Sequence, residues 1–179
     1  MFVPIEEKLK KIIPNVDQHD EFEYYKQILP KMIANGHAAH QTIPGYKDCK
    51  PEIEAFRWFD NINIPVHGYC DLKGKVIIED KCKFPKRGRV KKDGTRSWLT
   101  NKLPEEKPDS FHLLQIDFYY SVFKLPVYMC YINEESYKVF SADNCDDLKP
   151  ENIEKRIPKI IQRCKIRQNL MKISTDPKV

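Results

Sequence analysis

The segment HGYCDLKGKVIIEDKCK, residues 67–83, constrains the fold of this chain more than any other stretch. Its centre is the β-branched run from Val76 to Ile78, and a Lys-Gly-Lys turn stands directly before it. β-Branched residues favour strands, and glycine-containing turns join antiparallel neighbours. We therefore predict a β-hairpin in which a short buried strand follows HGYCD after a tight reversal.

Four charged residues lie at one end of this predicted hairpin. Asp71 ends the HGYCD segment, whereas Glu79, Asp80 and Lys81 end the apolar strand. Because strand side chains alternate between faces, Glu79 and Lys81 are expected on one face and Asp80 on the other. With HGYCD as the partner strand, Asp71 comes beside Glu79. Two carboxylates and an ammonium would suit a divalent metal and a phosphate, although a strand that simply runs out into solvent carries the same charges at little cost.

Length and composition are typical of one globular domain over residues 1–179, with 32% charged and 11% aromatic residues. The formal net charge of +5 permits a polyanionic partner without requiring one. No apolar run approaches the roughly 20 residues of a membrane helix, and the N-terminus lacks a signal-peptide core. We expect no membrane association and a cytoplasmic location, in a bacterium or a phage-infected host cell.

The cysteines do not suggest a metal cluster. None of the six forms a CxxC pair, and they are dispersed along the chain at Cys49, Cys70, Cys82, Cys130, Cys145 and Cys164. This spacing disfavours zinc and iron–sulfur sites. Several lie in apolar strand segments, where a free thiol packs as a small hydrophobe.

Hydrophobic spacing predicts five helices, over residues 5–13, 21–35, 51–61, 110–124 and 150–172. Strands are expected over residues 62–70, 76–81, 127–132 and 135–140. Pro51 would open one helix and Ser110 would cap another. Pro30 and Pro158 are expected to kink or break theirs. We divide the domain into N-terminal helices (1–35), a core (36–145) and a C-terminal basic helix (150–172).

A basic segment interrupts this core at residues 83–107. Asp93-Gly94 within it is a strong signal for a hairpin turn, so we predict a basic β-ribbon or arm. Cations and one indole would let such an arm grip a nucleic-acid backbone and stack a base, although a solvated surface loop is the more common role of a charge run. The candidate contacts are Lys86, Arg87, Arg89, Lys91, Lys92, Arg96 and Trp98.

Four short motifs follow one another along the chain: GHAAH at residues 36–40, GYCD at 68–71, IIEDK at 77–81 and QIDFY at 115–119. Together they resemble the RecB-like, lambda-exonuclease-like branch of the PD-(D/E)xK nuclease superfamily. That branch includes CRISPR-associated and phage exonucleases and the mitochondrial genome maintenance exonuclease. Cys70 stands where the family usually has proline. The resemblance implies an α/β fold with a restriction-endonuclease-like core, a central mixed β-sheet flanked by helices, to which this chain adds the basic β-ribbon arm.

The resemblance also implies a metal site. His40, Asp71 and Glu79, with the backbone carbonyl of Asp80, would bind Mg2+ or Mn2+, ions that suit oxygen ligands. Such an ion neutralises the scissile phosphate and lowers the pKa of bound water. Lys81 would orient the nucleophile and stabilise growing negative charge. Asp71, Glu79 and Lys81 would thus be the catalytic residues.

Gln115 and Tyr119 are four residues apart and share one helix face, where the resemblance implies that they hold the DNA backbone or support Lys81 and its strand. We therefore expect a metal-dependent DNA exonuclease of recombination, repair or degradation, acting on single-stranded DNA or an end-bearing duplex. A non-catalytic nucleic-acid-binding protein on the same fold, a structure-specific endonuclease and an α/β domain with coincidental motifs are the alternatives. The sequence does not determine strand polarity, RNA tolerance or oligomeric state.

Overall fold

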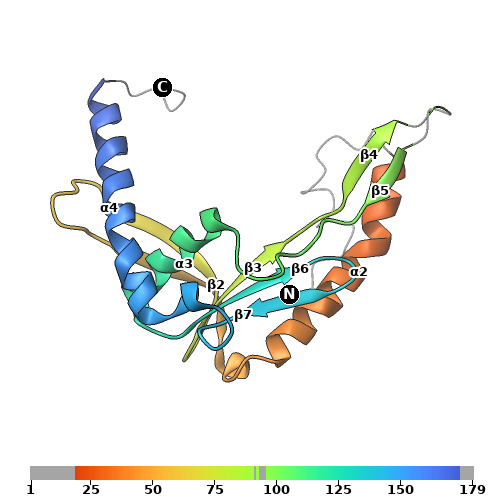
Figure 1. Ribbon diagram of the computed structural model, residues 1–179, viewed down its shortest axis with the longest axis horizontal. Coiled ribbons are helices and arrows are strands. Elements are labelled where there is room, and N and C mark those ends of the chain that lie inside the picture. Colours follow the sequence, from red (N-terminus) through yellow and green to blue (C-terminus); the bar gives the residue numbers. More distant parts are fainter. Residues whose placement is uncertain (1–18, 91, 93–95, 174–179) are drawn as a thin grey trace. The chain divides into compact units, whose positions relative to one another are not determined.

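The computed structural model describes residues 19–90, 92 and 96–173 (Figure 1). Its helices are α2 (His19–Gln41), α3 (Ser110–Phe123) and α4 (Pro150–Ile173), with 3-10 turns η1 (Tyr46–Asp48) and η2 (Asp146–Leu148). Its strands are β1 (Lys50–Arg57), β2 (Val66–Lys73), β3 (Ile77–Cys82), β4 (Lys86–Val90), β5 (Arg96–Leu99), β6 (Val127–Ile132) and β7 (Tyr137–Phe140). No helix in these ranges combines the length and the apolar character needed to cross a bilayer.

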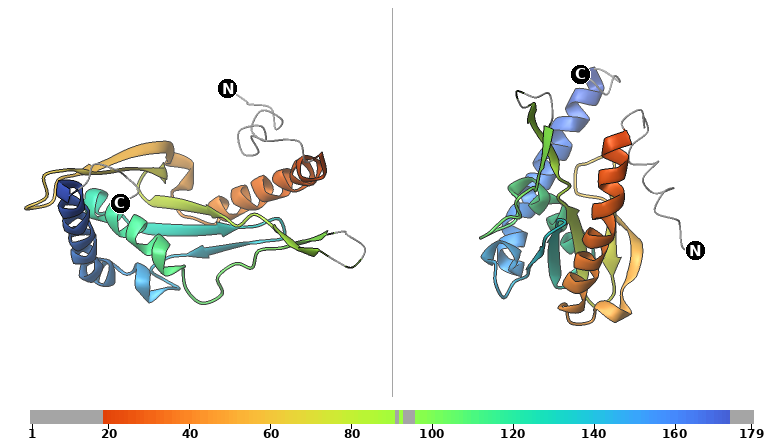
Figure 2. Two further views of the ribbon diagram at one scale, coloured as in Figure 1. Left: turned by 90° about the horizontal axis from the view of Figure 1, so that it is seen from above. Right: turned by 90° about the vertical axis from the view of Figure 1, so that its right-hand side faces the viewer.

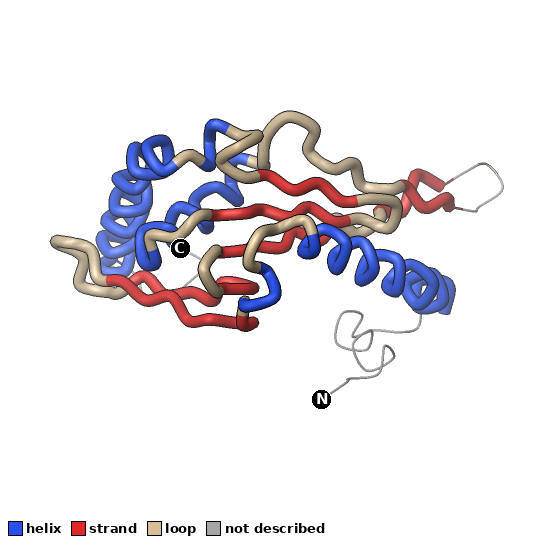
Figure 3. Tube along the Cα trace, turned by 90° about the horizontal axis from the view of Figure 1, so that it is seen from below, coloured by secondary structure: helices blue, strands red, loops and turns tan. Residues whose placement is uncertain are grey.

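Five strands form one mixed sheet in the order β1-β2-β3-β6-β7 (Figure 3). β1 pairs antiparallel with β2, and β2 pairs antiparallel with β3 across the predicted turn. β3 and β6 run parallel, because the Ile77 amide donates to the Pro126 carbonyl and, six residues along both strands, the Lys83 amide donates to that of Ile132. The fold is therefore α/β with a mixed central sheet flanked by helices, which confirms the predicted fold class and is consistent with a restriction-endonuclease-like core.

The chain divides into two compact units. The first contains the described residues up to Thr42, with Lys81–Leu103 and Tyr131–Lys138, and the second contains Ile43–Asp80, Pro104–Cys130 and the described residues from Val139 onward. In the second unit α3 covers β1 and lies against α4 (Figure 2). Asp117 of α3, fully buried, accepts two hydrogen bonds from Arg156 of α4, at 2.7 and 2.8 Å. An ion pair that links two helices inside the unit thus uses one of the cations of the predicted basic helix.

In the first unit, β4 and β5 form the separate two-stranded ribbon predicted from the basic segment. Lys91 and the Asp93-Gly94 turn lie outside the described residues. Trp98 stacks on Tyr24 of α2, with ring centroids 4.1 Å apart, and the Arg87 guanidinium lies 5.0 Å from the indole. The ribbon is therefore anchored to α2 through its indole.

The predicted helix over residues 51–61 is wrong, because this segment forms β1. The less exposed residues Ile53, Ala55 and Arg57 alternate with exposed positions, which is a period of two and not of 3.6. Pro51 is tolerated because β1 is an edge strand of the sheet. Pro51 therefore marks a sheet edge and not the start of a helix.

The other helices are confirmed, with corrections at their ends. α2 passes through Pro30 and continues beyond residue 35 to Gln41, and α4 passes through Pro158, so neither proline ends its helix. The N-cap of α3 is Asp109, and Ser110 is the first helical residue. The predicted helix over residues 5–13 lies outside the described residues.

Candidate functional site

Asp71 and Glu79 lie at the same end of the β2–β3 hairpin. The two strands pair through Leu72↔Ile78 and Lys73↔Ile77, and Asp71 and Glu79 are the next residues of β2 and β3 beyond these pairs. In addition, Oδ2 of Asp71 accepts a hydrogen bond of 2.7 Å from the backbone amide of Asp80. The hairpin thus brings Asp71, Glu79 and Asp80 together, and we call these three residues the acidic cluster.

The backbone on the other side of Asp71 is distorted. Glu52 of β1 lies between the pairs Pro51↔Leu72 and Ile53↔Cys70, and therefore across from Asp71. Its φ is +52°, in the left-handed region that residues other than glycine seldom adopt. Backbone strain of this kind concentrates at functional sites, where the surrounding structure maintains it.

The acidic cluster is partly buried. Glu79 is 1% exposed, whereas Asp71, Asp80 and Lys81 are half-buried. Removing carboxylates from water is costly unless positive charge or hydrogen bonds compensate. Lys81 follows Asp80 in β3 and, by strand alternation, leaves the chain on the same side as Glu79.

The negative charge of the acidic cluster contributes to the raised pKa values of two buried thiols. Burial, with Glu79 as the next contribution, raises the pKa of Cys70 to about 11. Burial also raises the pKa of Cys130, assisted by the Asp80 carboxylate, which accepts a hydrogen bond from this thiol, and by Asp71. Both cysteines are therefore protonated at neutral pH and pack as neutral groups.

Gln115 and Tyr119 of α3 support β2 directly. Nε2 of Gln115 donates to the Tyr119 hydroxyl at 3.0 Å, and that hydroxyl donates to the Tyr69 carbonyl at 2.5 Å. A Cβ on Gly68 would lie 3.4 Å from the Tyr119 ring and hydroxyl, so the glycine of GYCD allows the close approach of helix and strand. Burial raises the pKa of Tyr119 to about 12, and the hydroxyl is a stable donor. The two residues hold β2 two positions before Asp71.

We expect Tyr119→Phe to lower the free energy of unfolding by about 1–2 kcal/mol, because the Tyr69 carbonyl and the Gln115 amide both lose a buried partner. Urea denaturation measures the change. Tyr120→Phe is the matched control, since it removes a hydroxyl from the next, half-buried residue of the same helix. Equal stability of Tyr119→Phe and wild type would refute the supporting role of this hydroxyl.

The donor set of the acidic cluster fits a hard divalent cation. Its carboxylates and backbone carbonyls are oxygen donors, the kind that Mg2+ and Mn2+ take, and the neighbouring thiols of Cys70 and Cys130 are neutral. The burial of Glu79 beside Asp71 favours a compensating positive charge. Asp71, Glu79 and the Asp80 carbonyl are the groups of this unit that could hold such an ion.

The remaining predicted residues belong to the first unit. His40 lies in the last turn of α2 and is buried. Among the ribbon cations Lys86, Arg89 and Lys92 are exposed, whereas Arg87 is half-buried and pairs with Glu21 at 3.0 Å. Arg96 begins β5. Arg87 and Trp98 are thus engaged with α2, while the exposed cations face solvent.

Sequence reasoning did not find Tyr69 or Cys130 in this setting. Tyr69 contributes through its carbonyl, which every residue has, so no side-chain pattern marks it. Cys130 is one of several buried residues of β6, and only the neighbouring β3 brings Asp80 to it. Both contacts depend on tertiary pairing.

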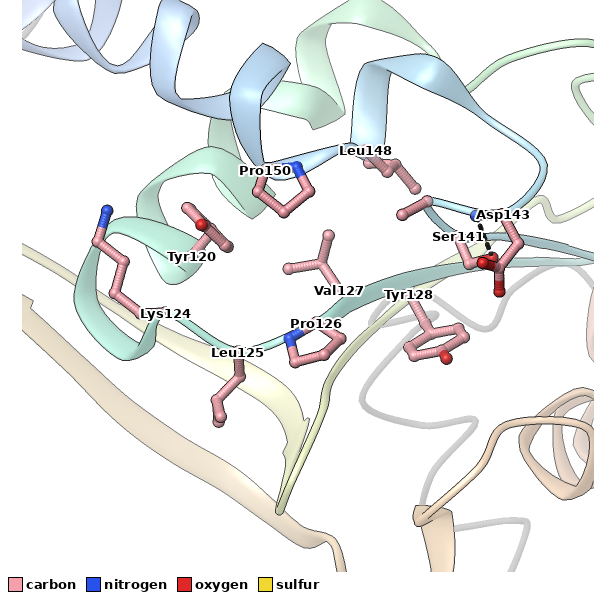
Figure 4. Close-up of a pocket in the computed structure, with 11 residues that line it drawn as sticks. Tyr120, Lys124, Leu125, Pro126, Val127, Tyr128, Ser141, Asp143, Leu148 and Pro150 are labelled. Atoms are coloured by element: carbon pink, nitrogen blue, oxygen red, sulfur yellow. Dashed lines mark hydrogen bonds between the residues drawn. The ribbon is translucent and has the colours of Figure 1, made fainter.

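A separate cavity of about 440 Å3 opens between the end of α3, the start of β6 and the loop after β7 (Figure 4). Its lining includes Tyr120, Val127, Tyr128 and Leu148, with Lys124 and Asp143 at its margins. It contains no residue of the acidic cluster. The cavity is therefore not part of the candidate site.

No family model matches the chain. No curated protein sequence matches it either. Among solved structures, the crystal structure of SSO0001 is similar to this chain with a TM-score of 0.42 and 14% sequence identity, over 97% of this chain and 72% of that one.

Proposed function

We propose that this chain is a metal-dependent deoxyribonuclease, and more specifically an exonuclease. The observation that carries the proposal is the acidic cluster: Asp71 and Glu79 follow the last pair of the β2–β3 hairpin, and Asp71 accepts the Asp80 amide at 2.7 Å, with Lys81 next in the strand. Two carboxylates at the end of one hairpin, one of them buried, suit a divalent cation, and the ammonium of the next strand residue suits a phosphate. The motif resemblance adds His40 as a further ligand and is the reason for choosing DNA as the substrate.

Each residue has a defined task in this proposal. A bound Mg2+ or Mn2+ would offset the charge of the scissile phosphate and lower the pKa of the water bound to the ion. Asp71, oriented by the Asp80 amide, and buried Glu79 would hold that ion. The Lys81 ammonium would orient the attacking water and stabilise charge on the phosphate oxygens. Hydrolysis by water needs no covalent protein intermediate, so no serine or cysteine nucleophile is required.

The test uses end-labelled single-stranded and duplex oligonucleotides incubated with Mg2+, with Mn2+ or with a chelator, and resolved on a sequencing gel. We expect successive shortening from one end with either ion and none with chelator. Internal cuts at a junction would instead favour a structure-specific endonuclease. Salt-sensitive binding without any ion-dependent product would favour a non-catalytic nucleic-acid-binding protein and refute the proposal.

A further inference from the structure

Four rings lie exposed on neighbouring positions of β1, β2 and the residue after β1. Phe56, Trp58 and Tyr69 are 48%, 57% and 55% exposed, and the side chain of His67 is 43% exposed. The ring centroids of Phe56 lie 6.1 Å from Trp58 and 6.4 Å from His67, and His67 lies 5.0 Å from Tyr69. We call these residues the aromatic row. Large exposed aromatics in contact with one another mark a binding surface more often than a solvated face.

The aromatic row leads to the acidic cluster along one face of the sheet. Phe56 pairs with His67, and alternation along β2 puts His67, Tyr69 and Asp71 on the same side. The opposite side of this strand pair is covered by α3, since Gly68 meets Tyr119 there. The row therefore lies on the open face, and its last ring is two residues from Asp71.

We propose that the aromatic row is the track for an unpaired DNA strand, whose bases stack on the rings while the strand runs toward Asp71. This inference rests on the proposed function for its choice of ligand. Stacking needs base faces that a duplex keeps covered, so the row selects single-stranded DNA. Because every base has such a face, binding would be tolerant of sequence.

A groove beside the row supplies a cation for the phosphates. It has a volume of about 440 Å3 and shares His67 with the row, and its other walls include Ile64, Gln168 and Arg167 of α4. Arg167 is exposed and suits a phosphate oxygen. Glu54, a further acid on this face besides Asp71, has its Oε1 2.9 Å from Nε2 of His67. The rings would thus bind bases while Arg167 binds the backbone.

The test measures Kd by fluorescence anisotropy with a labelled thymidine oligonucleotide and with a duplex of the same length, in chelator so that no cleavage occurs. We expect Phe56→Ala with Trp58→Ala to weaken single-strand binding at least about tenfold, with little effect on the duplex. Phe56→Tyr with Trp58→Phe keeps the stacking surfaces and should restore binding. Phe111→Ala is the matched control, because Phe111 is a 67% exposed ring of α3 outside the row.

Two further readouts separate the rings from the cation. The alanine double variant should keep the slope of log Kd against log salt, whereas Arg167→Ala should reduce that slope by about one. In Trp98→Phe protein, the fluorescence of Trp58 should be quenched as the thymidine oligonucleotide binds. An unquenched Trp58 would contradict stacking.

The inference is overturned if the alanine double variant binds the single strand as tightly as wild type, or if Phe111→Ala loses as much affinity. It is also overturned if the double variant converts a dimer to a monomer in light scattering, because the row would then contact a second copy. Row-dependent binding without any ion-dependent cleavage would sustain this inference and refute the proposed function. Ion-dependent cleavage whose rate is unchanged in the alanine double variant would sustain the proposed function and refute this inference.

Discussion

Asp71→Asn is expected to reduce DNA cleavage on the order of 100-fold or more while the protein stays folded. Asparagine has nearly the shape of aspartate and keeps an oxygen that can accept the Asp80 amide, so the contact of 2.7 Å in the wild type need not be lost. The substitution removes the negative charge that would hold a divalent cation. Rates on end-labelled oligonucleotides and thermal unfolding, measured on the same preparation, separate the two effects.

Companion variants show whether the loss belongs to the acidic cluster. Lys81→Ala should reduce cleavage by a similar factor, because the amine would act on the same phosphate. Asp143→Asn is a matched control, since it makes the same exchange at a margin of the separate cavity. Full activity of purified Asp71→Asn or Lys81→Ala protein would defeat the nuclease assignment.

Arg156→Met is expected to cause the largest loss of stability, about 3–5 kcal/mol in the free energy of unfolding, because it leaves a buried carboxylate without its partner. Asp117 is 0% exposed and accepts from Nε and one terminal nitrogen of Arg156, whose side chain is 14% exposed. That terminal nitrogen also donates to the Asp147 carbonyl at 2.5 Å. Urea denaturation of wild type and variant measures the difference.

The stability of Arg156→Met should depend on pH in a defined direction. Burial raises the pKa of Asp117 and the Arg156 guanidinium opposes this, so the substitution raises that pKa further. A carboxyl whose pKa is higher in the folded than in the unfolded protein contributes stability at pH values below its unfolded-state pKa, which is about 4. This contribution is lost as the pH rises through its folded-state pKa. The variant should therefore be closer to wild type in acid than at pH 8.

A double variant tests the same ion pair from the other side. Asp117→Leu with Arg156→Met removes both charges, and we expect it to recover much of the stability lost by Arg156→Met alone. A double variant no more stable than the single variant would mean that packing of the Arg156 side chain, and not the unpaired Asp117 carboxylate, is the cause. If Arg156→Met is destabilised relative to wild type by the same amount in acid and at pH 8, lost packing of the Arg156 side chain is again the cause.

Local signals in the sequence were enough to predict the hairpin of β2 and β3, the helices α3 and α4, the strands β6 and β7 and the two-stranded basic ribbon. These elements carry local signals, such as a Lys-Gly-Lys turn, a β-branched run or a proline at the first helical position. The position of Asp71 at the end of β3, where its carboxylate accepts the Asp80 amide, also followed from the sequence, because turn position is a local property.

The formation of an edge strand by residues 50–57 depends on tertiary pairing, since apolar residues next to a proline fit a short helix equally well. That misreading hid the aromatic row, because Phe56 meets His67 only through the pairing of β1 with β2. The Tyr119–Tyr69 and Arg156–Asp117 contacts join residues 50 and 39 positions apart. Partners so distant in the chain are chosen by the packing of whole elements, which no local pattern of side chains records.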